Sequence, residues 1–122
     1  MIAGSTPPEI TVDRDVVVAT LPEEIDLSNA RPIGSIVAAA VPNDAVGVVL
    51  DLSRTTYLDS SGVHVVFDLA DRVGARQQTL VLAVPPHSNV RRVLELVDVT
   101  VVAPMEDDVA AAKERARGQT GA

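Results

Sequence analysis

Two short, almost continuously apolar segments, residues 46–52 and 79–84, constrain the fold of this chain more than any other feature. Such runs are typical of strands that are buried on both faces of a sheet. Between them, apolar side chains recur at helical spacing from Val63 to Val73. Two parallel strands need a crossover connection, and the crossover is usually a helix. The pattern therefore predicts an α/β fold with a largely parallel sheet.

The rest of the chain continues the alternation of strands and helices. An alternating segment at 9–12 and a β-branched run at 16–21 flank the turn Asp13-Arg14-Asp15, which predicts an antiparallel hairpin. A last short strand is predicted at 99–103. The complete prediction is a mixed, mostly parallel sheet of about five strands with about four helices. The helices are expected around Ile33 to Ala40, around Val63 to Val73 with Gly74 as C-terminal cap, around Val90 to Val97, and from the acidic Glu106, Asp107 and Asp108 to the basic Lys113, Arg115 and Arg117.

The length of 122 residues suits one small domain. We expect this domain at residues 9–117, between a flexible leader at 1–8 and a flexible tail at 118–122. The first residues lack the basic stretch and apolar core of a signal peptide. No apolar run approaches the ~20 residues of a membrane span. These observations predict a cytoplasmic protein.

Composition excludes several kinds of chemistry. The formal net charge of −7 is opposite in sign to that of a protein that binds duplex DNA or an anionic membrane directly. The chain has one Phe, one Tyr and no Trp, too few for an aromatic platform that stacks single-stranded bases. It has no Cys, which excludes disulfides and thiolate catalysis. His64 and His87 do not have the spacing of metal ligands, so no metal and no cofactor are predicted.

The segment Asp59-Ser60-Ser61-Gly62 carries the functional signal. It lies where a buried strand is expected to end and a helix to begin, so backbone N–H groups point outward without partners. A helix N-terminus stabilises negative charge, and the fold would tolerate a phosphoserine there. Gly62 removes a side chain beside this point, which would let another molecule approach closely. Asp59 is also a competent N-cap, and an ordinary capping sequence is the alternative interpretation.

Two segments together resemble the STAS domain, the fold of bacterial anti-sigma factor antagonists. Residues 57–63, Tyr-Leu-Asp-Ser-Ser-Gly-Val, are similar to its signature of an apolar pair followed by Asp-Ser-Ser/Thr-Gly-Leu, with Val63 in place of Leu. Residues 23–26, Glu-Glu-Ile-Asp, are similar to the acidic motif before the first helix, except that Glu23 replaces a Gly. The resemblance extends from about Glu9 to Arg117.

This resemblance implies a partner-switching cycle and no catalytic activity. The second hydroxyl of the motif, Ser61, would accept phosphate from an anti-sigma factor serine kinase. The unphosphorylated form would bind that kinase and free the sigma factor, and a serine phosphatase would reset the switch. A monomer is the expected state. The resemblance places Asp26, Asp59, Ser60, Ser61 and Gly62 in the surface that contacts the partner.

Other functions remain as alternatives. A STAS domain can instead sense a nucleotide or lipid ligand. A response-regulator receiver is suggested by Asp51 at the end of a strand, but the only Lys, Lys113, lies in the last predicted helix. Asp51 is therefore expected to shape the loop that follows it. An enzyme is disfavoured by the lack of a Gly-rich phosphate loop, a metal cluster or a nucleophile–base pair.

Overall fold

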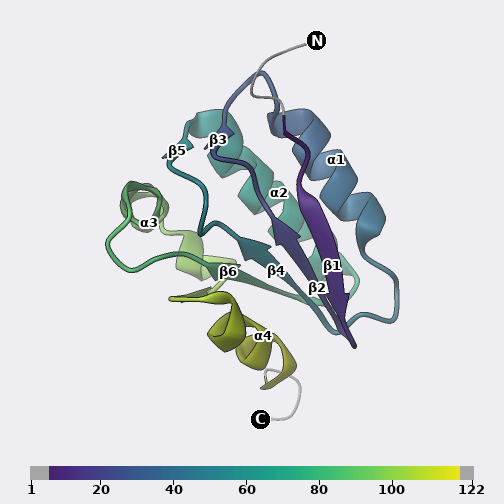
Figure 1. Ribbon diagram of the computed structural model, residues 1–122. Helices are drawn as coiled ribbons and strands as arrows, with labels where there is room; N and C mark the ends of the chain where they lie inside the picture. The colour runs from purple at the N-terminus through teal and green to yellow at the C-terminus, as the bar shows by residue number, and fades with distance from the viewer. Residues whose placement is uncertain (1–5, 119–122) are drawn as a thin grey trace.

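The computed structural model describes residues 6–118, in which a five-stranded sheet, a small two-stranded sheet and four α-helices are formed (Figure 1). The large sheet has the strand order β1-β2-β4-β6-β7. Strand β1 (Glu9–Asp13) pairs antiparallel with β2 (Val16–Thr20). The pairs that follow, through β4 (Gly47–Asp51), β6 (Thr79–Ala83) and β7 (Met105–Glu106), are all parallel. The predicted α/β fold with an opening hairpin is confirmed.

The two central strands are buried on both faces because a helical layer covers each side. All five residues of β4 are buried, and β6 pairs with it in the register Val48↔Leu80. Val48 and Leu50 belong to the larger core cluster, whereas Val49 belongs to a smaller cluster on the opposite face. This alternation explains why the sequence of a central strand is continuously apolar.

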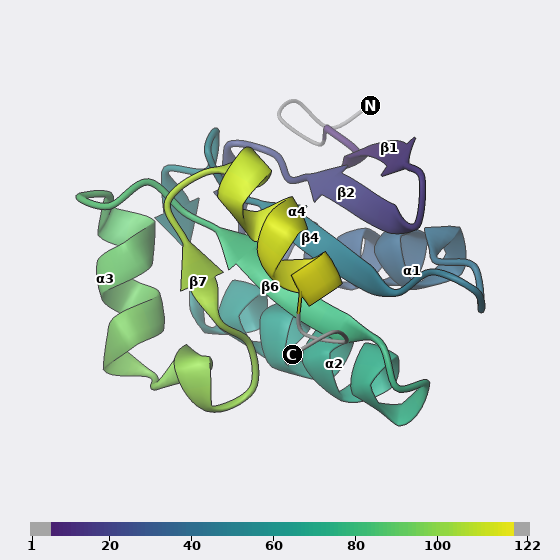
Figure 2. The ribbon, with the colours of Figure 1, turned by 90° about the horizontal axis from the view of Figure 1, so that it is seen from below.

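Helices α1 (Ala30–Ala40) and α2 (Ser60–Ala75) pack on one face of the sheet, and α4 (Val109–Gly118) packs on the other (Figure 2). Helix α3 (Asn89–Leu96) lies beside these layers, past the end of β6. Figure 1 shows that α1 and α2 begin at the same end of the molecule. The site described below lies at that end.

Helix α4 approaches the sheet closely because the residues in contact are small. Ala112 and Ala116 are fully buried against the central strands. A Cβ atom on Gly47 would lie 2.9 Å from the Ala116 Cβ and 2.9 Å from the Thr79 carbonyl oxygen. Helix α4 therefore covers the face of the sheet that α1 and α2 leave open.

Ion pairs fasten the same helix to the opening hairpin. The Lys113 Nζ lies 2.8 Å from the Asp13 Oδ2, and the Arg117 Nε lies 2.9 Å from the Asp15 Oδ1. The hydrogen bond and charge of Lys113 lower the pKa of Asp13, and the hydrogen bond from Arg117 lowers the pKa of Asp15. Both aspartates are therefore ionised at neutral pH.

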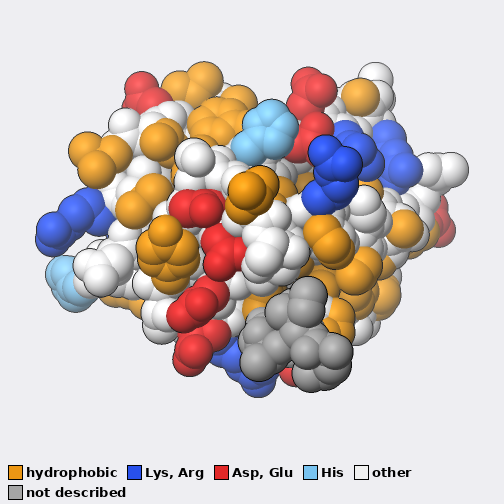
Figure 3. Space-filling model, turned by 90° about the horizontal axis from the view of Figure 1, so that it is seen from above, with side chains coloured by type: hydrophobic (Ala, Val, Ile, Leu, Met, Phe, Trp, Pro, Cys, Tyr) orange, Lys and Arg blue, Asp and Glu red, His pale blue; other side chains and the backbone are white. Residues whose placement is uncertain are grey.

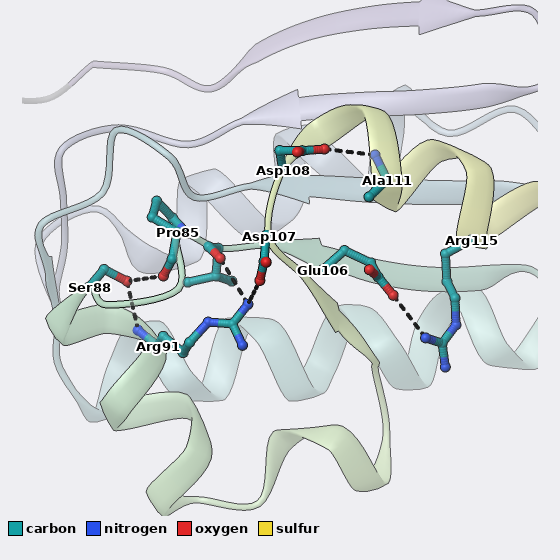
Figure 4. A network of polar contacts seen from close by, with 9 residues as sticks. Pro85, Ser88, Arg91, Glu106, Asp107, Asp108, Ala111 and Arg115 are labelled. Carbon is teal, nitrogen blue, oxygen red and sulfur yellow. Dashed lines mark hydrogen bonds and ion pairs between the residues drawn. The ribbon is translucent and has the colours of Figure 1, made fainter.

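A second polar network holds the start of α3 against the segment that leads into α4 (Figure 4). The Ser88 Oγ accepts a hydrogen bond from the Arg91 backbone N–H at 3.1 Å and donates one to the Pro85 carbonyl at 3.0 Å. Ser88 is thus the N-cap of α3. The Arg91 guanidinium donates to the Val84 carbonyl and to Asp107, each at 3.0 Å.

The strand predicted at 99–103 is wrong. Asp98 has a left-handed backbone with φ 61°, and Val99–Val101 form a 3₁₀ turn, η1. The Val99 carbonyl accepts hydrogen bonds from the N–H groups of residues 102 and 103, so this segment cannot pair with the sheet. The last strand, β7, comes after Pro104. The strand propensity of the valines is overridden here because Val101 is 77% exposed, and of the three valines in the segment only Val99 is buried in the core.

The predicted end of the second helix also needs correction. Helix α2 continues through Gly74 to Ala75, with Arg76 as its C-cap. The residue that takes the left-handed backbone after it is Gln77, with φ 62°. The N–H groups of residues 76–78 close the helix end on the Val73 and Gly74 carbonyls, so a glycine is not needed at the turn.

The predicted boundaries of the domain stay a prediction, because the structure describes only part of the two flanking segments. Residues 1–5 of the expected leader and 119–122 of the expected tail lie outside the described residues. Within the leader, Thr6 and Pro7 are exposed, but Pro8 is buried. Gly118 belongs to α4.

Candidate functional site

Asp59 initiates α2 by capping it. The Asp59 Oδ1 accepts hydrogen bonds from the backbone N–H groups of Ser61 at 2.8 Å and Gly62 at 3.1 Å. The Asp59 backbone is extended, as an N-cap requires. Its own N–H donates to the Ile25 carbonyl at 3.2 Å, which ties the cap to a neighbouring segment. The capping role is therefore present, and it fixes the position of both serines.

The neighbouring segment forms a small parallel sheet that the sequence analysis missed. Strand β3 (Glu24–Ile25) pairs with β5 (Tyr57–Leu58), with Ile25 opposite Leu58. Asp26 and Asp59 follow this last pair directly, so they leave the small sheet side by side. Adjacent strands lie about 4.8 Å apart. The structure thus brings together the two acidic residues that the sequence places far apart.

The Asp26 carboxylate organises the loop before α1. Its Oδ1 accepts hydrogen bonds from the Ser28 hydroxyl and, at 2.9 Å, from the Ser28 backbone N–H. The bond from the hydroxyl, followed by that from the N–H, lowers the pKa of Asp26. The Asn29 Oδ1 accepts from the Asp26 N–H at 2.9 Å, and the Asn29 Nδ2 donates to the Glu24 carbonyl at 2.8 Å. The site therefore contains an ionised Asp26 in a well-held loop.

Ser60 and Ser61 face a groove between α1 and α2. Ser60 is exposed and Ser61 is half-buried, and within residues 6–118 neither hydroxyl has a hydrogen-bond partner. Both hydroxyls are thus available to another molecule. The groove has a volume of about 620 Å³, and its wall on the α1 side includes Leu27, Arg31, Gly34 and Ser35.

The packing of the fold itself explains why position 62 is a glycine. It is buried, and a Cβ atom added to it would lie 2.4 Å from the Leu58 Cδ1 and 3.1 Å from the Ile25 Cγ2. The crowding that requires a glycine comes from the small sheet beneath α2, whereas the sequence analysis attributed it to an approaching molecule. A contact between Gly62 and a partner stays a prediction.

The end of the molecule that carries this site presents a mixed surface. Figure 3 shows acidic side chains interleaved with apolar ones over this end, and basic side chains toward the edges on either side of them. Two large apolar side chains are exposed here that were not predicted as contact residues from the sequence. Leu27 is 83% exposed and Tyr57 is 51% exposed. Their signal was present in the sequence, since Leu27 directly follows the acidic motif and Tyr57 is the first residue of the other motif, each next to polar residues. Such residues suit contact with a protein partner.

Asp51 and the two histidines do not join the site. Asp51 is buried at the end of β4, where it accepts hydrogen bonds from the Thr20 hydroxyl at 3.2 Å and the Ser53 N–H at 3.0 Å. The expectation that Asp51 shapes the following loop is confirmed. His64 lines the groove, whereas His87 lies in the exposed loop before α3. No cluster of metal-ligating side chains is found within residues 6–118.

Comparison with known proteins identifies the family. The STAS domain matches residues 7–112, and the chain belongs to the STAS domain family. A protein of Bordetella bronchiseptica named as an anti-sigma factor antagonist, BtrV, is 32% identical over 107 residues, which cover 85% of this chain and 90% of that protein. The identity and coverage of this relative place the chain in the family of anti-sigma factor antagonists. The resemblance stated from the two motifs is confirmed.

Solved structures share the fold. A Thermotoga maritima protein described as an anti-sigma factor antagonist has a TM-score of 0.76 at 22% identity, over 90% of this chain and 94% of that chain. SpoIIAA in its unphosphorylated form has a TM-score of 0.72 at 24% identity, over 91% and 96% of the two chains. The phosphorylated form of Bacillus SpoIIAA has a TM-score of 0.66 at 20% identity, over 88% and 97%. Separately, none of the helices within residues 6–118 has the length and apolar character to cross a membrane.

Proposed function

We propose that this protein binds an anti-sigma factor serine kinase in its unphosphorylated form, releases the sigma factor, and is switched off by phosphorylation of Ser61. The observation that carries the proposal is the position of the Ser61 hydroxyl. It has no hydrogen-bond partner within the described residues, it faces an open groove, and it lies on the first turn of a helix that Asp59 fixes in place. The relative SpoIIAA has been solved with and without phosphate, which supports a phosphorylation switch.

The surface around Ser61 suits a partner that is apolar in part and basic in part. Leu27 and Tyr57 supply exposed apolar area, and Asp26 supplies a carboxylate beside them. The net charge of −7 favours encounter with a basic surface. The partner-binding residues of the proposal are Asp26, Asp59, Ser60, Ser61 and Gly62, together with Leu27 and Tyr57.

A phosphate on Ser61 would weaken the complex by a local effect. It adds about −1.5 to −2 charges near neutral pH. It would lie close to the carboxylates of Asp59 and Asp26, inside a surface that must fit tightly against the kinase. Crowding and like-charge repulsion of about 3 kcal/mol would weaken binding ~100-fold. No large rearrangement of the fold is needed.

The remaining parts of the cycle follow from this switch. A serine phosphatase would remove the phosphate and restore binding. The protein would act as a monomer in the cytoplasm, where a kinase has access to ATP. Size-exclusion chromatography with light scattering tests the monomer, and a dimeric mass would contradict it.

Intact mass after incubation with ATP and candidate anti-sigma kinases tests the proposal. The wild type should gain one phosphate, Ser61→Ala should gain none, and the matched control Ser60→Ala should still gain one. Ser61→Ala should keep binding the kinase in the presence of ATP, whereas Ser61→Asp should fold normally and bind weakly. If Ser61→Asp bound as tightly as the wild type, the electrostatic switch would be wrong. No phosphate with any kinase would instead favour a STAS domain that senses a nucleotide or lipid, detected as ligand-dependent thermal stability.

A further inference from the structure

Within residues 6–118, the groove between α1 and α2 is lined both by the proposed phosphoacceptor and by one arginine that has no partner. Arg31, on the first turn of α1, lines the same groove as Ser61 on the first turn of α2. Its side chain is exposed and, within residues 6–118, forms no hydrogen bond or ion pair. The other guanidinium of the groove, that of Arg72, is already held by Asp68, with 3.1 Å between Nε and Oδ2. Arg31 is therefore the cation of the groove that is available for a new anion.

We infer that Arg31 pairs with the phosphate on Ser61 within the same chain, and so holds the switched-off state. This inference rests on the proposed function, because it requires Ser61 to carry a phosphate. A guanidinium presents a planar fork of N–H donors that matches phosphate oxygens and makes charge-assisted hydrogen bonds with them. The long side chain of an exposed arginine can reorient toward the phosphate without a change in the backbone.

The arrangement of the two helices favours the same pairing. Helices α1 and α2 both begin at this end of the molecule (Figure 1), so the positive ends of both helix dipoles lie near the phosphate. Asp26 and Asp59 directly follow the last pair of the small sheet, so their two carboxylates belong to the same end of the molecule. Pairing with Arg31 would offset the repulsion between these carboxylates and a phosphate on Ser61.

The pairing adds a second component to the switch. Besides adding charge to the partner surface, the phosphate would draw Arg31 across the groove beside Leu27. A kinase side chain that enters the groove in the unphosphorylated form would then find it occupied. The off state is in this way a property of the chain itself, in addition to repulsion at the interface.

The test uses the full chain with phosphoserine incorporated at position 61 during translation, so that no kinase is required. A ³¹P NMR titration measures the pKa of the second phosphate ionisation, which is near 6 for free phosphoserine. Replacing the paired cation should favour the protonated phosphate, so Arg31→Gln should raise this pKa by about half a pH unit. Arg31→Lys, which keeps the charge, should retain a large part of the parent value. Comparison between variants is needed because other charged groups lie around the phosphate: Asp26, Asp59, His64, Asp68 and Arg72.

Arg92→Gln is the matched control. Arg92 is an exposed arginine on α3, away from the groove, and likewise has no partner within the described residues. This variant should leave the phosphate pKa unchanged. Repeating the comparison in a His64→Gln background removes a neighbouring side chain that lines the same groove.

Two results would overturn the inference. One is a phosphate pKa that is the same in Arg31→Gln and the parent, and the other is an equal rise in Arg92→Gln. A rise of the phosphate pKa in Arg72→Gln without one in Arg31→Gln would likewise overturn it, because the phosphate would then pair with Arg72 and not with Arg31. These failures are distinct from failure of the proposed function, which would show as absence of phosphate after incubation with kinases while the incorporated phosphoserine still titrates.

Discussion

Replacing Gly62 with Ala adds one methyl group where the small sheet meets the first turn of α2. The new Cβ would lie 2.4 Å from the Leu58 Cδ1, 3.0 Å from the Leu58 Cγ and 3.1 Å from the Ile25 Cγ2. Leu58 and Ile25 are 6% and 1% exposed, so both side chains belong to the packed core. Relief of the clash therefore requires repacking of these core side chains or a displacement of α2 from β5, together with the cap made by Asp59.

Two opposing effects set the magnitude. Alanine in place of glycine within a helix stabilises by about 0.5–1 kcal/mol, because less conformational entropy is lost on folding. Overpacking of a filled core costs about 1–3 kcal/mol. The clash is the larger effect, so Gly62→Ala should lower the free energy of unfolding by about 1 kcal/mol. In a domain of this size the melting temperature should fall by about 4 °C.

Gly34→Ala is the matched control, because it also replaces a helical glycine with alanine but creates no clash. A Cβ on Gly34 would lie 3.8 Å and 3.9 Å from the two Val65 methyl carbons, which is ordinary contact. This variant should be more stable than the parent by about 0.5–1 kcal/mol. Urea unfolding followed by circular dichroism measures both variants against the parent. If Gly62→Ala were as stable as Gly34→Ala, the close packing of β3 and β5 under α2 would be refuted.

Three further changes test other parts of the structure. Asp59→Ala should lower the free energy of unfolding by about 1 kcal/mol through loss of the cap, whereas Asp59→Asn should keep most of it; urea unfolding distinguishes the two. Gly47→Ala should destabilise by about 1–3 kcal/mol, because its Cβ would lie 2.9 Å from the Ala116 Cβ, and Ala116→Gly in the same chain should restore part of the loss. Asp13→Asn should lower the melting temperature at neutral pH. Because Lys113 lowers the pKa of Asp13 below its ordinary 3.8, the Asp13 contribution is complete above that pH and is lost as the pH falls further. Melting curves of Asp13→Asn and the parent should therefore converge in acid, and a difference independent of pH would contradict the ion pair.

The part of the candidate site formed by one short segment was predictable from the sequence, because the geometry of that segment depends only on its own residues. Asp59 and the two serines that follow it form a cap whose hydrogen bonds are all local, so their placement at a helix start needs no distant residue. The neighbourhood of Asp26 was predictable only through the resemblance to the STAS domain. Its position next to Asp59 depends on the pairing of Ile25 with Leu58, between strands too short to show an alternating pattern.

The groove residues show the limit of the sequence most clearly. Arg31 and Ser61 lie on different helices, and nothing local to either residue indicates that both line one groove. Their proximity follows from the packing of α1 against α2 on the same face of the sheet.

The sequence by itself determined the order of the four helices and of the first four strands of the large sheet, the burial of the two central strands and the helix start at the motif. These features depend on periodicity, capping and turn residues, which act over a few neighbouring positions. The tertiary structure decided the small sheet, the 3₁₀ turn at Val99–Val101 and the groove beside Ser61. Each of these depends on which segments pack against one another, and that is settled by burial of apolar surface over the whole chain and not by local preference.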